Sequence, residues 1–147
     1  MKQIRRAESN DLIRVVELSK KWEDEEITYG LKANSIDDLL PYLEQEFWVI
    51  IDNDEIIGYL LGQVKKNEGY AIFERLEQSF FEIDEIYIEV EHRKRNIGTE
   101  LINKVLKSLQ ELGIERTIVS SANKELQKTL GFYEKNGFKN WTITLFK

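Results

Sequence analysis

The sequence predicts an α/β protein, with an α+β-type mixed sheet flanked by helices, in a single domain that spans residues 1–147. Its 147 residues are enough to bury a hydrophobic core. The best strand candidate, Phe80 to Val90, is rich in β-branched and aromatic residues and is apolar on both faces, as in a central strand covered on both sides. Amphipathic helix patterns alternate with other strand patterns along the chain.

The first half of the chain is predicted to form a strand, two helices and a β-hairpin. The first helix has potential caps at residues 9–11 and an apolar stripe. Ser35 caps the second helix, and Pro41 either kinks this helix or begins its second part. The hairpin turns at residues 52–55, which are typical of turns. The predicted strands are residues 2–7, 47–52 and 56–65, and the predicted helices are residues 11–23 and 35–45.

The second half adds the central strand and, after it, two helices and two strands. One helix begins near Gly98 and ends at Gly113, a typical C-cap residue. The last strand alternates polar and apolar residues, which leaves one of its faces in solvent. Residues 71–78 are ambiguous, because they could extend the hairpin or form an irregular crossing. The remaining predicted elements are strands at residues 114–120 and 138–146 and a helix at residues 122–136.

The composition excludes several classes of function. The net charge is −6, and an acidic chain with one basic cluster is a poor general binder of nucleic acid. The absence of cysteine excludes disulfides and thiolate chemistry, and the one histidine, His92, cannot build a histidine-rich metal site. No apolar run approaches the roughly 20 residues of a membrane span, and no signal peptide is visible. We therefore expect a cytoplasmic protein without a metal and without membrane association.

Acidic residues within the central strand are the first indication of a site. Glu82, Asp84 and Glu85 lie among its apolar residues, where a carboxylate is costly unless it is paired or faces a cleft. Strict alternation would place Glu82 and Asp84 on the face of Ile86 and would point Glu85 to the opposite face. Each acid could instead pair with a lysine or arginine across the sheet.

A basic turn follows this strand and leads directly into a helix. The turn, His92 to Thr99, contains an Arg-Lys-Arg run and also Asn96 and Gly98, the residue types that most readily adopt a positive φ. The helix N-terminus presents free backbone N–H groups and the positive end of a dipole. Such an end beside basic side chains suits an anion, so the sequence predicts a phosphate cradle.

Two motifs resemble those of the GCN5-related N-acetyltransferases, the GNAT family. Arg93 to Gly98 is similar to the family motif Q/R-x-x-G-x-G/A, with Asn96 in place of the first glycine. Gly131 to Phe138 (GFYEKNGF) is similar to the family's FYEKxGF motif, and the two motifs occur in the expected order. The resemblance is good over residues 50–147 and rests on pattern alone over residues 1–46. It implies a central, mostly antiparallel sheet flanked by helices.

The resemblance also implies acetyl-CoA as the co-substrate, with no metal. In the family, the pantetheine of acetyl-CoA pairs with the backbone of the central strand, which corresponds here to Ile86, Tyr87 and Ile88. The pyrophosphate lies on backbone N–H groups of the basic turn, with the basic side chains and Thr99 Oγ within reach. The implied phosphate-binding residues are Arg93, Lys94, Arg95, Asn96, Ile97, Gly98 and Thr99.

Asn123 resembles a family asparagine that bonds pantetheine from the start of the last helix. In the family this asparagine commonly precedes the catalytic tyrosine by seven residues, whereas Asn123 precedes Tyr133 by ten. On a helix, a residue ten positions before Tyr133 points about 60° away from the direction of a residue seven positions before it. Asn123 is therefore either a pantetheine contact or only a helix cap.

Direct transfer to an amine needs a base for the ammonium proton, donors for the oxyanion and an acid for the departing sulfur. Tyr133 occupies the family position of that acid. Glu82 corresponds to a carboxylate that some members place four residues before the pantetheine-pairing stretch, and adjacent acids of polyamine-acetylating members match Asp84 and Glu85. Glu82 and Asp84 are the preferred bases, and Glu85 is a candidate substrate contact. A base could also act through a chain of waters.

The acceptor side is less well defined by the sequence. The acidic run Glu23 to Glu26 is either a solvated face or a surface that attracts a cationic amine. In the family, the segment between the first two helices borders the acceptor site, so Trp22, Glu26 and Tyr29 are candidates for its wall. We expect an enzyme that acetylates a primary amine of a small cationic molecule, such as a polyamine or an aminosugar.

Two alternatives remain open at the level of sequence. The acceptor could be a peptide N-terminus or a lysine side chain. The protein could also be a non-catalytic acyl-CoA-binding module, because Asn96 and the spacing of Asn123 depart from the family pattern. A homodimer is possible, since dimers are common in the family and the last strand could supply an edge.

Overall fold

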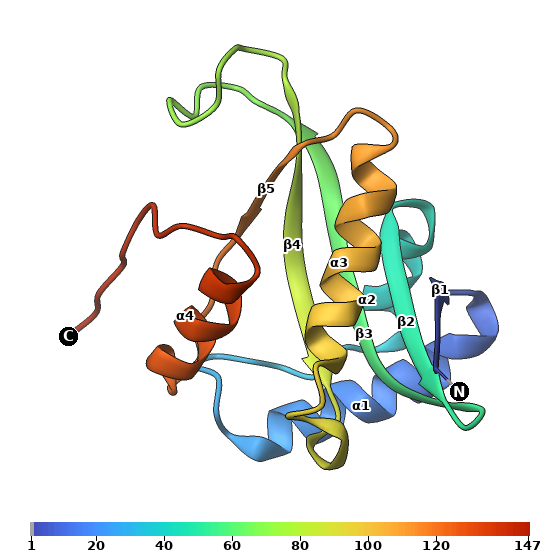
Figure 1. The fold of residues 1–147 in the computed structure, drawn as a ribbon. Helices are drawn as coiled ribbons and strands as arrows, with labels where there is room; N and C mark the ends of the chain where they lie inside the picture. Colours follow the sequence, from blue (N-terminus) through green and yellow to red (C-terminus); the bar gives the residue numbers. More distant parts are fainter. Residues whose placement is uncertain (1) are drawn as a thin grey trace.

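The computed structural model describes residues 2–147, and its central feature is a five-stranded sheet (Figure 1). The strands follow one another in the sheet in chain order, β1-β2-β3-β4-β5. Neighbouring strands are antiparallel except β4 and β5, which are parallel. The predicted mixed, mostly antiparallel sheet is confirmed. The strands are β1 (Lys2–Arg6), β2 (Glu46–Asp52), β3 (Glu55–Lys66), β4 (Ser79–Ile88) and β5 (Arg116–Val119).

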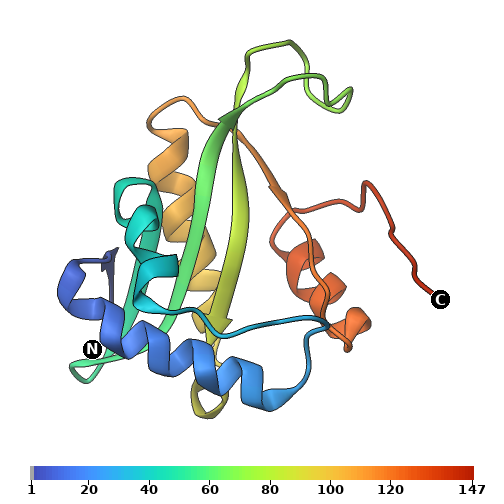
Figure 2. The same cartoon turned by 180° about the vertical axis from the view of Figure 1, so that it is seen from behind.

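Helices cover both faces of this sheet. Helices α1 and α2 lie on one face and α3 on the other, while α4 stands beside β5 (Figures 1 and 2). None of the helices within residues 2–147 is both long and apolar enough to cross a bilayer. The α-helices are α1 (Leu12–Glu25), α2 (Ile36–Leu39), α3 (Ile97–Gln110) and α4 (Leu126–Lys135), and the 3₁₀ turns are η1 (Ser9–Asp11), η2 (Leu40–Glu44) and η3 (Val90–His92).

Two hydrophobic cores correspond to the two faces of the sheet. Leu101 and Val105 of α3 pack with Ile83 of β4 in one core. Leu18 of α1 packs with Tyr59 of β3 and Tyr87 of β4 in the other. Because β4 contributes buried side chains to both cores, its prediction as a central strand is confirmed.

The second predicted helix is realised as two short pieces. Ser35 caps α2, with its Oγ accepting a hydrogen bond from the Asp38 amide at 3.2 Å. Pro41 then lies in the first turn of η2, as expected of a residue that has no amide proton to donate.

The pairing of β3 with β4 is interrupted by a β-bulge. Gly62 is opposite Ile83 and Leu61 is opposite Glu85, so Asp84 is an extra residue on β4. A Cβ atom on Gly62 would lie 2.2 Å from the carbonyl oxygen of Glu82. The absence of a side chain at Gly62 is therefore required by the close approach of the two strands. A bulge bends its strand and increases the local twist.

The pairing of β4 with β5 is short. It extends only from Phe80, opposite Arg116, to Ile83, opposite Val119. Beyond Ile83, β4 continues to Ile88 without a neighbour on that side, and the two strands are drawn apart in Figure 1. The parallel strands thus open a gap at their C-terminal ends.

Two predictions for the second half of the chain are corrected, and one that had two alternatives is settled. The predicted strand at residues 138–146 is absent: Phe138 bonds back to the Tyr133 carbonyl, and within residues 2–147 no strand pairs with residues 139–146. The last helix begins at Leu126 rather than at residue 122, because residues 122–124 pair with the segment after α1. Residues 71–78 form an irregular loop and do not extend the hairpin.

We predict opposite effects for alanine at two glycines. Gly62→Ala lowers the free energy of unfolding by about 1–3 kcal/mol, because the new methyl group overpacks the bulge. Gly131→Ala, in α4, raises it by about 0.5–1 kcal/mol, because the new methyl group would meet no neighbouring atom within 4 Å and alanine favours a helix. Urea denaturation followed by circular dichroism measures both. An unchanged urea midpoint for Gly62→Ala would contradict the close approach.

Candidate active site

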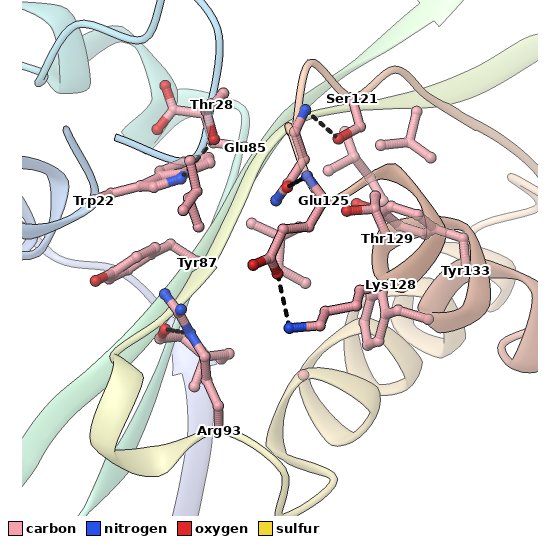
Figure 3. A pocket seen from close by; sticks show the side chains of 18 of the residues that line it. Trp22, Thr28, Glu85, Tyr87, Arg93, Ser121, Glu125, Lys128, Thr129 and Tyr133 are labelled. Atoms are coloured by element: carbon pink, nitrogen blue, oxygen red, sulfur yellow. Dashed lines mark hydrogen bonds and ion pairs between the residues drawn. The ribbon is translucent and has the colours of Figure 1, made fainter. Parts of the chain in front are cut away.

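A cleft of about 600 Å³ opens where β4 and β5 separate. Its walls come from β4, the turn before α3, the segment after β5, helix α4 and the end of α1 with the residues that follow. In Figure 3, Trp22 and Tyr87 face Tyr133 and Lys128 across this cleft, with Arg93 at one end. Elements from both halves of the chain therefore meet at one site.

The floor of the cleft is the unpaired part of β4. Ile86, Tyr87 and Ile88 all line it, and none of them has a partner on β5. One edge of this backbone therefore has no partner on β5, although the Ile88 carbonyl accepts a hydrogen bond from Arg93 Nε. This is the stretch on which the resemblance placed pantetheine.

The turn before α3 forms a second wall of the cleft. Asn96 has φ 62° and Lys94 has φ 65°, so both adopt the left-handed conformation that was expected of Asn96. The Glu100 amide donates to the Asn96 carbonyl at 2.9 Å. The preceding amides of Ile97, Gly98 and Thr99 belong to the first turn of α3, where amides have no acceptor within the helix. They face a ligand with the positive end of the dipole.

Gly98 is needed because α4 lies against this turn. A Cβ atom on Gly98 would lie 3.1 Å from the Phe132 ring. Two hydrogen bonds also join α4 to the turn: Lys135 Nζ donates to Asn96 Oδ1 at 3.4 Å, and Asn136 Nδ2 donates to Thr99 Oγ1 at 3.2 Å. The two motifs of the sequence therefore come together in space.

The three basic side chains of the turn are placed differently from one another. Lys94 lines the cleft, whereas Arg95 is exposed and does not contribute to its lining. Arg93 lines the cleft, but its guanidinium forms two hydrogen bonds to Glu25 of α1, at 2.7 and 2.8 Å. Arg93 also donates to the Ile88 carbonyl at 2.8 Å.

The Arg93 contacts change the expectation for this residue. Tyr87 stacks under the guanidinium, 5.3 Å from it, and donates a hydrogen bond to the same Glu25 carboxylate at 2.7 Å. The Arg93 amide is used as well, because it donates to the Val90 carbonyl. Arg93 therefore joins the end of α1 to the end of β4, and its expected phosphate contact stays a prediction.

Two of the three β4 carboxylates lie in the cleft. Glu85 accepts hydrogen bonds from Asn34 Nδ2 at 2.9 Å and from Tyr59 Oη at 2.8 Å. Burial raises the pKa of Glu85, although these two hydrogen bonds oppose the rise. Asp84 accepts from Tyr42 Oη at 2.5 Å and from Gln63 Nε2 at 2.8 Å.

Glu82 is placed outside the cleft. It pairs with Lys65 Nζ at 2.7 Å and does not contribute to the lining. The prediction that Glu85 points away from Glu82 and Asp84 is wrong, because the extra residue at the bulge resets the alternation of β4. Both Asp84 and Glu85 bond to side chains from the α1 face of the sheet, whereas Ile86 packs with the core on the α3 face.

Tyr133 lies on α4 and lines the cleft opposite the carboxylates. Its ring packs edge-on against Phe132 and Phe138, with centroids 5.1 and 5.3 Å apart. Burial raises the pKa of Tyr133 to about 12. The hydroxyl therefore keeps its proton at neutral pH and can donate it to a developing anion.

Asn123 lines the cleft as well, but its side-chain oxygen acts locally. Asn123 Oδ1 accepts a hydrogen bond from the Glu125 amide at 2.7 Å, two residues later. The backbone of Asn123 forms a bridge with Thr28, which ties this wall to the segment after α1. The Oδ1 contact is a local turn before the helix and not a helix cap, because α4 begins at Leu126 and its N-cap residue is Glu125; the pantetheine contact of Asn123 stays a prediction.

Of the three residues predicted for the acceptor wall, one lines the cleft and two do not. Trp22 lines the cleft, stacks on Tyr87 with centroids 5.3 Å apart, and donates to Thr28 Oγ1 at 3.1 Å. Glu26 is the left-handed residue that ends α1, with φ 55°, and Tyr29 is exposed on the outer surface. Glu26 and Tyr29 do not line the cleft.

Several residues of the site were not singled out by the sequence. Asn34 and Tyr59 orient Glu85, and Glu25 holds Arg93. Glu25 belongs to the acidic run that was noted, but nothing in the sequence distinguishes it from its neighbours. Lys128 and Lys135 line the cleft from α4, where a helical spacing of seven places them on the same face. Within residues 2–147, no group of three or more acidic, histidine or cysteine side chains could hold a metal ion.

Comparison with known proteins identifies the family. The model of the acetyltransferase (GNAT) family matches residues 8–138. No curated protein sequence matches the chain.

Similar solved structures share the fold at low sequence identity. An aminoglycoside acetyltransferase, meta-AAC0020, from an uncultured soil metagenomic sample has 20% identity and a TM-score of 0.75, over 99% of this chain and 95% of that one. AAC(6')-Iy, in complex with a bisubstrate analog, has 14% identity and a TM-score of 0.78, over 100% and 97%. An acetyltransferase with acetyl-CoA from Clostridium acetobutylicum has 18% identity and a TM-score of 0.73, over 100% and 96%. The family match covers nearly the whole chain, and the protein therefore belongs to the GNAT family and is an acetyl-CoA-dependent N-acetyltransferase.

Proposed function

We propose that this protein acetylates a primary amine of a small cationic molecule by direct transfer in a ternary complex, with Tyr133 as the general acid. Residues 1–147 act as one catalytic domain in this proposal. The observation that carries it is the convergence of three donors on one cleft: the free edge of β4, the first turn of α3 and the protonated Tyr133 hydroxyl. Two carboxylates, Asp84 and Glu85, complete the cleft.

The donor half of the cleft suits a phosphorylated, extended ligand. The free backbone of Ile86 to Ile88 can pair with the amides of pantetheine, as one more strand would. The amides of Ile97, Gly98 and Thr99 can hold the pyrophosphate. Arg93 is paired with Glu25 and Lys128 with Glu125, so Lys94 and Lys135, which also line the cleft, are the proposed cationic contacts of the phosphates.

The acceptor half suits an amine. A primary ammonium, with a pKa of about 10.4, must lose a proton before its nitrogen can attack. Glu85 is the proposed base, because its raised pKa makes it a stronger proton acceptor than an ordinary glutamate and because Asn34 and Tyr59 fix its orientation. Asp84 adds a second negative charge that attracts a cation. The aminoglycoside acetyltransferases among the similar structures, by their names, act on small amines of this class.

Bond making and breaking then balance within the cleft. The amine nitrogen attacks the acetyl carbonyl, the carbon–sulfur bond breaks, and the sulfur leaves with the electron pair. The protonated Tyr133 hydroxyl donates a hydrogen bond to this sulfur and passes its proton to it, and Tyr133 regains a proton from the second N–H proton that the attacking nitrogen loses as it becomes an amide. A thiol has a pKa of about 8.5, so a thiolate accepts a hydrogen bond readily near neutral pH.

The first prediction tests binding and turnover together. Saturation with acetyl-CoA at about 100 times its Kd raises the stability by about 2.7 kcal/mol, which thermal melting detects. A panel of polyamines, aminosugars, peptides with free N-termini and lysine peptides, each with acetyl-CoA, is then assayed for release of free thiol. Release with the small amines alone supports the proposal. A melting shift with no thiol release for any amine would indicate an acyl-CoA-binding module and contradict the proposed catalysis. Thiol release with peptides only would contradict the proposed small-molecule acceptor.

The second prediction concerns Tyr133→Phe. Loss of the hydroxyl lowers kcat by about 10²- to 10⁴-fold, the range of a lost general acid, while the Kd for acetyl-CoA stays within about twofold. Tyr70→Phe is the matched control, because Tyr70 lies in the loop between β3 and β4, outside the cleft. Equal kcat values for Tyr133→Phe and the parent protein would remove Tyr133 from the mechanism.

The third prediction concerns the pH dependence of kcat/KM. A general base acts only when it is deprotonated, so kcat/KM rises with pH as Glu85 loses its proton. Because burial raises the pKa of Glu85, the midpoint of this rise lies above the usual glutamate pKa of about 4.3. Glu85→Gln lowers the rate and removes this acidic limb, whereas Glu82→Gln, outside the cleft, retains it. If Asp84→Asn removes the limb and Glu85→Gln does not, the base is Asp84.

A further inference from the structure

One polar residue lies within the apolar face of helix α1. Ser19 belongs to the same helical stripe as Leu12 and Val15, and like Val15 it has an exposed fraction of 0%. A buried hydroxyl costs free energy unless its oxygen and its proton both find partners. Ser19 does not line the cleft, so its hydroxyl is not placed to contact a ligand there. Its partners are therefore other residues of the protein.

Ser19 contacts both of the residues that donate hydrogen bonds to Glu85. Ser19 Oγ accepts a hydrogen bond from the Asn34 amide at 2.8 Å, which holds the segment before α2 against α1. The hydroxyl of Ser19 supplies a hydrogen bond to Tyr59, which is itself completely buried. Asn34 Nδ2 and Tyr59 Oη then donate to Glu85 Oε1, at 2.9 and 2.8 Å. Four residues from α1, the segment before α2, β3 and β4 thus close a ring of hydrogen bonds.

The direction of donation in this ring makes Glu85 an acceptor. The Asn34 amide donates to Ser19, and Ser19 donates to Tyr59. Tyr59 donates to Glu85, so every proton on this path points towards the carboxylate. A backbone amide cannot accept a proton in return, so the path cannot carry a proton away from Glu85. Glu85 Oε1 accepts two hydrogen bonds, whereas Oε2 accepts one, from Asn34 at 3.1 Å, and keeps a free lone pair.

The groups that face Glu85 are negative or neutral. Burial raises the pKa of Glu85, the charges of Asp84 on β4 and Asp38 on α2 add to the rise, and the hydrogen bonds from its two donors oppose it. Burial also raises the pKa values of Tyr42 on η2 and Tyr59 on β3, so both hydroxyls are neutral near pH 7. The carboxylate form of Glu85 therefore depends on hydrogen bonds from neutral donors that are correctly aimed.

We propose that Ser19 is a positioning residue for the reaction, which acts on Glu85 through Asn34 and Tyr59 and keeps this carboxylate ionised, with Oε2 free for the proton of the amine. The inference rests on the proposed function of Glu85 as the base. Ser19 holds each donor from behind, because it fixes the backbone of Asn34 and the hydroxyl of Tyr59. Both constraints lie outside the cleft and do not depend on a bound ligand.

The pH profile of kcat/KM tests this role. Ser19→Ala removes both constraints, so Glu85 holds its proton more tightly and the midpoint of the acidic limb moves to higher pH. Tyr59→Phe, which removes one donor outright, is expected to move the midpoint further, by about one pH unit. The matched control is Val15→Ala, because Val15 is equally buried on the same face of α1 but carries no polar group. Val15→Ala is expected to lower the melting temperature and to leave the midpoint unchanged.

A direct titration of Glu85 separates this inference from the proposed catalysis. Carboxyl ¹³C NMR of the protein without ligands follows the ionisation of Glu85, whose signal is the one that is missing from Glu85→Gln. The midpoint of this titration is expected to rise in Ser19→Ala and to stay the same in Val15→Ala. An unchanged midpoint in Ser19→Ala overturns the inference, whether or not Glu85 is the base. A raised midpoint that the kcat/KM profile does not follow would confirm the action of Ser19 on Glu85 and overturn the proposed base instead.

Discussion

The site depends on the bulge at Asp84, where β4 bends away from its regular course. The extra residue lies directly after Ile83, and Ile83 is also the last residue of β4 that pairs with β5. A bulge bends a strand and increases its twist, so the interruption on one edge of β4 coincides with the loss of its neighbour on the other edge. The part of β4 that lines the cleft begins here, with Ile83, and continues to Ile88. Gly62 makes the bulge possible, because no side chain would fit beneath the Glu82 carbonyl.

The bulge also explains how a central strand carries adjacent acids. A buried carboxylate without partners would cost several kcal/mol, and the fold supplies partners for both. Tyr42 of η2 and Gln63 of β3 donate to Asp84, while Tyr59 of β3 and Asn34, just before α2, donate to Glu85. The short helix α2 and its flanking turns therefore orient the acceptor side of the cleft as well as covering the sheet.

The sequence predicted the parts of the site that depend on local structure. The left-handed Asn96, the helix start after it and the strand before it are each set by residues within one short stretch, and all three are confirmed. The side of the sheet on which Glu85 lies was predicted wrongly, because one inserted residue reverses every later position of a strand. The pairing of Arg93 with Glu25 could not be predicted, because the two residues are 68 positions apart in the chain. The segment at residues 138–146 was predicted as a strand from its pattern, but a pattern does not supply the neighbouring strand.

The charges of the cleft are separated along its length, which reconciles an acidic chain with an anionic co-substrate. Lys94, Lys128 and Lys135 lie at the α3–α4 end, and Asp84 and Glu85 lie on β4 towards the α1 face. At physiological ionic strength a charge is screened beyond about 8 Å, so a ligand responds to the nearest groups and not to the net charge of −6. The pairing of Arg93 with Glu25 sharpens this separation, because it neutralises a cation and an anion at the boundary between the two ends. Glu125 also lines the α3–α4 end, where it pairs with Lys128, so lysines outnumber acids at that end, whereas the β4 side of the cleft carries two carboxylates.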